Sequence, residues 1–437
     1  MHHRLATSNA SSQLWGLVLG SWILAGCGGD NTTTSPTDAS TLAPSETASD
    51  TNTDSDSETE GTQLPSHLLV TADWQAHRLS LLDLDSILAG ETYASALAGT
   101  IDLAGREPGP IQLVVTADAK ALVSISPGFF DGSVGTTIGV TPVPASTGEL
   151  LIVDLDTGTL LAELSPQSPA MGVVLDPVRP QAFTANFGDE AARGTTISVI
   201  DLDALAIVDE IEVGDGPEQL AISDDGEAAL VSLASAGEIR GFSPADPGAT
   251  LSPGVVTSGD PSGIAFVPGT HTAIIANSQN SPNYTLVDLT DPQLPVILEQ
   301  GENPGGIPFA VAARGTRAWF ASSTFAQVQI NEVDLSGQPS VLAAPWSFDG
   351  NTFPLSLRLV PTDVDATTTR ALLALPGLDQ LAVVDLDSRT VVPIDVPGGP
   401  TDLAILIRRQ NNLCKSPHRW ETCSFVTARR LEKILIP

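Results

Sequence analysis

The stretch Ile197–Gly226, which reads "ISVIDLDALAIVDEIEVGDGPEQLAISDDG", decides the fold of this chain. It opens with an apolar run that ends in Asp-Leu-Asp, and a second run with β-branched residues on alternate positions follows. After a Gly-Pro pair, a third apolar run leads into the tight-turn signal Asp224-Asp225-Gly226. Short alternating runs bounded by turn residues are typical of β-strands. The stretch therefore predicts three consecutive short strands joined by tight turns.

The first of these runs recurs along the chain, each time ending in Asp-Leu-Asp or a variant of it. The copies are LSLLDLD (79–85), LLIVDLD (150–156), ISVIDLD (197–203), EIRGFSP (238–244), YTLVDLT (284–290), INEVDLS (330–336) and LAVVDLD (381–387). Their markers, the first Asp or Phe242 in the degenerate fourth copy, stand at 83, 154, 201, 242, 288, 334 and 385, so the spacings are 71, 47, 41, 46, 46 and 51. Seven copies with a period of about 46 residues predict an all-β fold, a seven-bladed β-propeller of four-stranded blades.

The two ends of the repeat region complement each other. The segment 67–85 begins at the second strand of a repeat, whereas GPTDLAILI (399–407) is a first strand with no successor. Together they supply one complete blade. We therefore expect a ring closed by N-terminal strands plus a C-terminal strand, which removes two exposed sheet edges. An open solenoid is the alternative, and it leaves those edges unpaired.

Two second-strand segments, AFTANFGD (182–189) and AIIANSQN (273–280), resemble the YVTN-type β-propeller repeat, as does the stretch quoted first. This group is also called the YncE-like or lactonase-like seven-bladed group, and the resemblance covers residues 66–407. The fold hosts lactonases, dehydrogenase subunits, adhesion modules and scaffolds, so the resemblance implies a fold and leaves the function open. The chain departs from the repeat because copy four lacks the Asp and most second strands lack the Tyr.

Residues 1–26 are predicted to be a lipoprotein signal peptide. The run LWGLVLGSWILA (14–25) gives about twelve largely apolar residues, which is too short to span a bilayer but suits a signal-peptide core. Leu24-Ala25-Gly26-Cys27 resembles the lipobox of bacterial lipoproteins. The resemblance implies a bacterial chain that is cleaved before Cys27 and carries lipid on that residue. An ordinary cleaved leader with an incidental cysteine is the alternative.

The next segment, residues 27–65, is rich in Ser and Thr, and its residues 28–64 contain Asp and Glu but no basic residue. Such a composition cannot bury enough apolar surface to offset its ordering entropy, so we expect a disordered acidic linker. A lipid followed by a tether predicts a propeller held at the bacterial cell envelope. The outer membrane or a periplasmic face is favoured, and Gly28 after the lipidated residue points to the outer membrane.

The net charge limits the partners. The chain has 19 basic and 52 acidic residues, a formal charge of -33, which disfavours nucleic acid. We found no His pair spaced for zinc, no Gly-x-Ser-x-Gly motif and no phosphate-binding loop, so neither cofactor nor metal is predicted. The leading hypothesis is a membrane-anchored propeller that binds a protein or small-molecule ligand or serves as a scaffold. A lactonase-like or cofactor-dependent periplasmic enzyme and a structural component of an envelope complex are the alternatives.

One long insertion marks a candidate ligand face. The segment 127–148 explains the 71-residue spacing and falls between the second and third strands of its blade. In such blades these loops share a face with the connections from each fourth strand to the next blade, and long loops on rigid scaffolds often carry function. The candidate ligand face consists of Trp74, Phe129, Phe130, Asp131, Asn186 and Asn277. The alternatives are a variable loop packed as a lid and residues that close turns.

The C-terminal tail, residues 408–437, differs in composition from the acidic body because its charged residues are mostly basic. Cys414 and Cys423 lie close together in it and can form a disulfide after export. A segment that is not native coding sequence, as after a frameshift, is the alternative.

Overall fold

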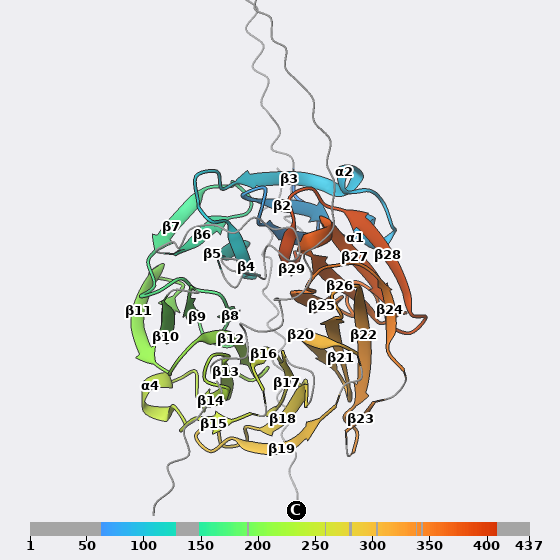
Figure 1. Ribbon diagram of the computed structural model, residues 1–437. Helices are drawn as coiled ribbons and strands as arrows, with labels where there is room; N and C mark the ends of the chain where they lie inside the picture. The colour runs from blue at the N-terminus through green and yellow to red at the C-terminus, as the bar shows by residue number, and fades with distance from the viewer. Residues whose placement is uncertain are drawn as a thin grey trace, which may run out of the picture. The chain divides into compact units, whose positions relative to one another are not determined.

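A computed structural model describes residues 63–127, 148–189, 192–257, 259–278, 282–302, 305–337, 339–341 and 344–408. Within these residues the chain forms seven antiparallel sheets arranged around a central axis (Figure 1). Each sheet is a blade of four strands, and the sixth blade has one strand more. The predicted all-β, seven-bladed β-propeller is confirmed.

We number the blades in chain order and give the strands of each from the axis outward. Blade 1 consists of β29 (Pro400–Ile407), β1 (His67–Asp73), β2 (Arg78–Asp83) and β3 (Leu97–Asp102). Blade 2 consists of β4 (Pro110–Val115), β5 (Lys120–Ile125), β6 (Glu149–Asp154) and β7 (Leu160–Leu164). Blade 3 consists of β8 (Val173–Leu175), β9 (Gln181–Gly188), β10 (Arg193–Asp201) and β11 (Ala206–Glu212).

The other four blades follow the same order. Blade 4 consists of β12 (Pro217–Ile222), β13 (Ala229–Leu233), β14 (Glu238–Phe242) and β15 (Val255–Val256). Blade 5 consists of β16 (Pro261–Phe266), β17 (Thr272–Asn277), β18 (Tyr284–Asp288) and β19 (Val296–Gly301). Blade 6 consists of β20 (Ile307–Arg314), β21 (Arg317–Ser323), β22 (Gln327–Asp334), β23 (Ser340–Val341) and β24 (Trp346–Asp349), which also pairs with β22. Blade 7 consists of β25 (Ser356–Leu359), β26 (Arg370–Leu375), β27 (Gln380–Asp385) and β28 (Thr390–Asp395).

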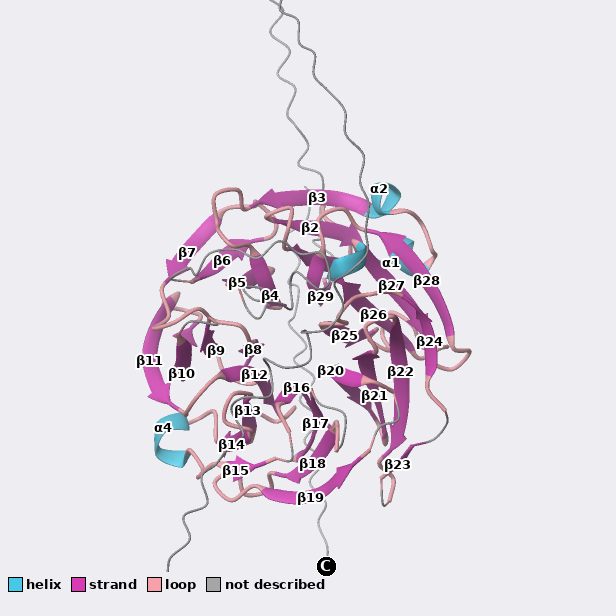
Figure 2. Ribbon diagram, in the orientation of Figure 1, coloured by secondary structure: helices cyan, strands magenta, loops and turns pink. Residues whose placement is uncertain are grey.

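Helices are few and short in the described residues. They are α1 (Leu84–Leu88), α2 (Tyr93–Ala96), α4 (Pro247–Thr250) and the 3-10 helix η1 (Pro376–Leu378). Figure 2 shows α2 and α4 at the outer rim of the ring, where they replace the tight turn between a third and a fourth strand. No helix in this part of the chain has the length and apolar character needed to cross a membrane.

The ring is closed as the chain ends predict. Strand β29 pairs antiparallel with β1, from His67 opposite Ile407 to Asp73 opposite Pro400. Within β29, the Asp402 carboxylate accepts a hydrogen bond from the Leu113 N–H of blade 2 at 3.0 Å. The same carboxylate pairs with Arg358 of blade 7, again at 3.0 Å. One side chain of the closing strand therefore ties together the two blades on either side of it.

The hydrophobic core lies between the blades. One cluster of buried apolar side chains fills each interface between neighbouring blades in the described residues. At the interface of blades 3 and 4, for example, the rings of Phe183 and Phe242 lie 5.6 Å apart. Phe242 is the degenerate marker of the fourth repeat, and β14 forms in spite of the missing Asp. Because each blade packs only on its neighbours, one atypical copy does not interrupt the ring.

The repeat gives the ring two different faces. We call the face where innermost strands begin and second strands end the mouth face; this is shown by the pairs Pro217 with Leu233 and Pro261 with Asn277. We call the opposite face the turn face. The long insertion leaves blade 2 between β5 and β6, at the mouth face. Its residues 128–147 lie outside the described residues.

The marker aspartates cap turns on the turn face. Asp201, for example, accepts hydrogen bonds from the N–H groups of Asp203 at 2.8 Å and Ala204 at 2.9 Å. The corresponding residues of five further repeats act in the same way: Asp83, Asp154, Asp288, Asp334 and Asp385. An Asp side chain that accepts from the backbone two or three residues ahead stabilises a tight turn. The recurring Asp-Leu-Asp is therefore a structural signature of the blade.

Candidate functional site

At the mouth face the central channel opens into a hollow of about 310 Å³, a volume that includes space open to solvent. Each blade contributes one residue near the beginning of its innermost strand. These seven residues are Ile111, Met171, Glu218, Ser262, Phe309, Leu355 and Thr401. Gln112 and Gln219 complete the lining. We refer to the seven residues as the channel lining.

The repeat explains why these positions face the axis. In six blades the lining residue directly follows a proline near the start of the innermost strand, as in Pro217-Glu218 and Pro261-Ser262. Proline is tolerated there because it stands at the beginning of a strand whose axial edge has no neighbouring strand. Four of the seven lining residues are apolar and two carry hydroxyl groups. Glu218 is the one ionisable residue among the seven.

Glu218 is buried and makes few polar contacts. Its side chain belongs to a residue that is 8% exposed, and Ser262 Oγ donates a hydrogen bond to its Oε1 at 2.6 Å. Burial raises the pKa of Glu218 to about 7 in spite of that hydrogen bond; the charge of Asp260 acts in the same direction and that of Arg193 against it. Among the ion pairs of the described residues, none includes Glu218. The carboxyl group therefore changes its protonation state near neutral pH.

Two charged residues, Arg193 and Asp260, act on the pKa of Glu218. Arg193 stacks on an aromatic ring and Asp260 is partly buried. Arg193 begins β10, and its guanidinium carbon lies 4.3 Å from the centre of the Phe187 ring. This geometry is that of a cation–π contact, which holds the cation over the ring. Asp260 immediately precedes β16, and its partial burial raises its pKa. Glu218 thus faces one cation and one acid at a distance instead of a paired counter-ion.

Aromatic rings connect the channel lining to the surface. Phe309 of the lining packs edge-to-face on Phe353, with ring centres 4.7 Å apart, and Phe353 packs edge-to-face on Phe325 at 5.6 Å. Phe325 is 49% exposed and has a φ angle of 64°. A positive φ is uncommon for a bulky residue. Backbone conformations of this kind are strained, and they cluster at functional sites. The three rings form an apolar path from the channel to the mouth face.

The structure places three of the predicted ligand-face residues inside the blades. Trp74 and Asn277 end second strands or follow them directly, and Asn186 lies near the end of β9; all three are buried. Asn186 donates to Thr196 Oγ1 and Ser198 Oγ, each at 2.9 Å. These contacts join neighbouring strands of one blade. A contact between any of the three and a ligand stays a prediction.

Asn277 and Trp74 make comparable internal contacts. Asn277 donates to Thr285 Oγ1 at 3.0 Å, within blade 5. Trp74 Nε1 donates to the Ser126 carbonyl at 3.5 Å, which links blade 1 to blade 2. The remaining predicted site residues lie outside the described residues: Cys27, Phe129, Phe130, Asp131, Cys414 and Cys423.

Sequence reasoning missed the channel lining, although one signal for it was present. When the repeats are aligned on the strand-opening proline, the next residue is Ile, Glu, Ser, Phe, Leu or Thr, so Glu218 stands out as the charged one. The aromatic path has no such signal because its three rings come from separate turns and strands. In the described part of the chain, no group of three or more His, Cys, Asp or Glu side chains is placed to hold a metal ion.

Comparisons with known proteins agree with this fold. No protein-family model and no curated protein matches the sequence. Among solved structures, a functionally unknown protein from Desulfotomaculum acetoxidans is similar, with a TM-score of 0.59, 16% identity, and coverage of 78% of this chain and 99% of that one. The periplasmic gluconolactonase PpgL of Pseudomonas aeruginosa has a TM-score of 0.56 and 15% identity, and covers 78% and 99%. A putative 6-phosphogluconolactonase from Bacteroides fragilis has a TM-score of 0.55 and 13% identity, and covers 78% and 98%. Identities this low establish the propeller fold and nothing finer.

Proposed function

We propose that this protein is a lipid-anchored propeller of the bacterial cell envelope that binds a small molecule in the channel at its mouth face. The observation that carries the proposal is Glu218, a buried carboxyl group without an ion-pair partner in the described part of the chain, set in an otherwise mainly apolar lining. Concave, largely apolar sites with a few polar groups and a perturbed pKa are the usual setting of ligand binding. The exposed ring of Phe325 at the rim supports the same face.

Binding is tested by identifying the small molecules that stay bound to the protein during purification. Full-length protein purified from bacterial membranes is denatured, and the small molecules that it releases are identified by mass spectrometry. Ser262→Phe places a ring in the hollow and should abolish retention, while thermal unfolding checks that the variant folds. Thr257→Ser, a conservative change near the same face but outside the lining, is the control. Equal retention by wild type and Ser262→Phe would refute binding in the channel.

The anchor is tested separately. The lipobox resemblance at Leu24–Cys27 and the acidic linker support attachment through lipid, because several acyl chains hold a protein on a bilayer where one does not. Metabolic labelling with an alkynyl fatty acid should mark the wild type and not the Cys27→Ala variant. Equal labelling of both would overturn the anchor and leave the propeller's binding unaffected.

A lactonase-like activity is the second candidate, and Glu218 is the observation that favours it. A carboxyl group with a pKa of about 7 is suited to act as a general base or acid at neutral pH. Two similar structures are described as a gluconolactonase and a putative 6-phosphogluconolactonase. Glucono-δ-lactone hydrolysis in a pH-stat decides between the candidates. A rate above the uncatalysed one that is lost in Glu218→Gln would favour the enzyme, whereas the same rate in both proteins would favour the binding protein.

A further inference from the structure

We infer that the ligand of the channel is a small amine in its protonated form, with an ammonium group placed at Glu218 and an apolar or aromatic body placed against Phe309. The inference rests on the proposed function, since it assigns a chemical class to the ligand of that same site. It follows from what Glu218 lacks, from what surrounds it and from the charge of the whole chain.

The first step is the unfilled capacity of Glu218. A carboxylate has about four lone-pair sites for hydrogen bonds, and Ser262 Oγ supplies one donor at 2.6 Å. The residue is more than nine-tenths buried and faces the hollow. An isolated buried carboxylate is costly, and a hydrogen-bonded cation is the partner that removes the cost. An ammonium group offers three donors and a positive charge in one small unit.

The second step is the rest of the lining. Ile111, Met171, Phe309 and Leu355 present apolar or aromatic surface to the same hollow. Phe309 continues through edge-to-face contacts to Phe353 and on to the rim. Aromatic faces attract ammonium groups and also pack on apolar bodies. The hollow is narrow and opens to solvent, so a small molecule suits it and a polymer does not.

The third step is the sign of the electrostatic field around the protein. The chain carries a formal charge of -33, which attracts cations and repels anions at long range. Asp260 adds negative charge close to Glu218. Arg193 is the nearby cation that favours an anion instead, and its guanidinium lies over Phe187. The balance of the site favours a cationic ligand, and the test includes an anion because of Arg193.

The test uses three probes of nearly equal shape on the full-length protein in detergent: phenethylamine, 2-phenylethanol and 3-phenylpropanoate. Calorimetric titration at pH 8 should give the tightest binding for phenethylamine, at least about tenfold tighter than for 2-phenylethanol, because a charge-assisted hydrogen bond is gained. Glu218→Gln should abolish that preference while 2-phenylethanol binds as before. Glu227→Gln, which changes an exposed carboxylate on the turn face, is the matched control and should behave as wild type.

Three outcomes overturn the inference. They are a preference for 3-phenylpropanoate, an amine preference that survives in Glu218→Gln, and no binding of phenethylamine at millimolar concentration. If one of these is found while wild type retains a native molecule that Ser262→Phe does not, the amine class fails and the proposed function stands. If neither protein retains a molecule and no probe binds, both fail.

Discussion

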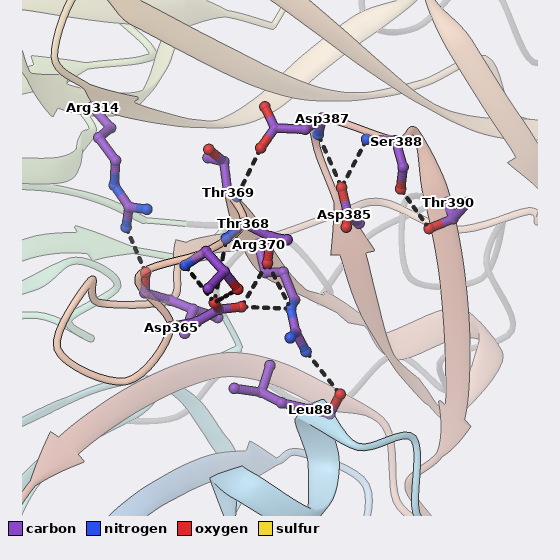
Figure 3. A network of polar contacts seen from close by, with 12 residues as sticks. Leu88, Arg314, Asp365, Thr368, Thr369, Arg370, Asp385, Asp387, Ser388 and Thr390 are labelled. Atoms are coloured by element: carbon purple, nitrogen blue, oxygen red, sulfur yellow. Dashed lines mark hydrogen bonds and ion pairs between the residues drawn. The ribbon is translucent and has the colours of Figure 1, made fainter.

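The mouth face and the turn face are built from the same seven repeats, yet two carboxylates, Asp365 on the turn face and Glu218 at the mouth face, have opposite surroundings. Around Asp365, charged side chains are paired with one another and with the backbone. Figure 3 shows Asp365 with Thr368 and Arg370, while Arg370 also donates to the Leu88 carbonyl of blade 1 at 2.8 Å. At the mouth face, Glu218 has one hydrogen-bond donor and no ion pair among the described residues. The contrast marks Asp365 as part of a structural network and Glu218 as a carboxylate with acceptor capacity left for a ligand.

The turn-face network also shows how blades are held side by side. Arg314 of blade 6 donates to the Val360 carbonyl of blade 7, and Arg370 of blade 7 reaches blade 1. The hydrogen bond from Thr368, together with others and the charge of Arg370, lowers the pKa of Asp365 well below its usual range. The network thus spans three successive blades, including the one that closes the ring.

The largest effect is expected on the turn face. Asp365→Ala removes the acceptor shared by Thr367, Thr368 and Arg370, and leaves the partly buried Arg370 without its carboxylate partner. Breaking such a pair should lower the free energy of unfolding by about 3 to 4 kcal/mol, and phenethylamine binding should not change. Urea unfolding measures the first and calorimetry the second. Asp363→Ala, an exposed neighbour, is the control; an equal loss in both variants would contradict the structural role.

A somewhat smaller effect is expected for Glu218, and its sign depends on pH. The folded protein binds the Glu218 proton more tightly than the unfolded chain, because the pKa rises from 4.5 to about 7 on folding. Stability is therefore highest below about pH 4.5 with respect to this group, and falls as pH rises toward 7. Relative to wild type, Glu218→Gln should gain about 2 to 3 kcal/mol between pH 5 and pH 8. Unfolding curves at both pH values measure the gain, and a constant difference would contradict it.

A third effect concerns the rim. Phe325→Ala shortens the aromatic path where it reaches solvent, so phenethylamine binding should weaken by about fivefold, since an aromatic contact contributes on the order of 1 kcal/mol. Stability should change by less than about 0.5 kcal/mol, because the ring is half exposed. Val178→Ala removes an exposed apolar side chain from the turn face and should leave binding unchanged. A loss of binding in both variants would mean that the effect is not specific to the mouth.

The smallest effect is expected at a single turn. Asp201→Ala deletes the acceptor for two backbone N–H groups and should cost about 1 kcal/mol, whereas Asp201→Asn keeps an acceptor and should cost less than about 0.3 kcal/mol. Thermal unfolding of the two variants provides the comparison. If both lose the same stability, the carboxylate charge matters more than the turn geometry.

The sequence was sufficient for the fold because the fold is a repeated local pattern. The marker Asp, the alternating runs and the turn residues recur in copy after copy, so a degenerate copy such as the one at Phe242 does not hide the period. The complementary ends at 67–85 and 399–407 also predicted the closing blade, because each lacks what the other supplies. The short helix α4 and the extra strand β24 were not predicted, since they occur once and have no period.

The site was harder to predict, for a physical reason. Asn186 and Asn277 are polar residues at strand ends, which is where ligand contacts are often found, but tertiary packing turned them inward toward partners on neighbouring strands. Glu218 looks like any surface glutamate until seven innermost strands converge on one axis. Convergence of residues far apart in sequence is a property of the closed ring, and the period alone does not reveal which residue type faces the axis.

The central claim is that Glu218, at the mouth face, binds the ammonium group of a ligand. The pKa of Glu218 is its most direct test. It can be followed by NMR of the ¹³C-labelled glutamate carboxyl group in the full-length protein, with the signal assigned by its loss in Glu218→Gln. We predict a pKa of about 7 in the free protein, and a decrease of at least about one unit with saturating phenethylamine, because a bound cation stabilises the carboxylate. A pKa near that of an exposed glutamate in the free protein, or a value that phenethylamine leaves unchanged, would contradict the account.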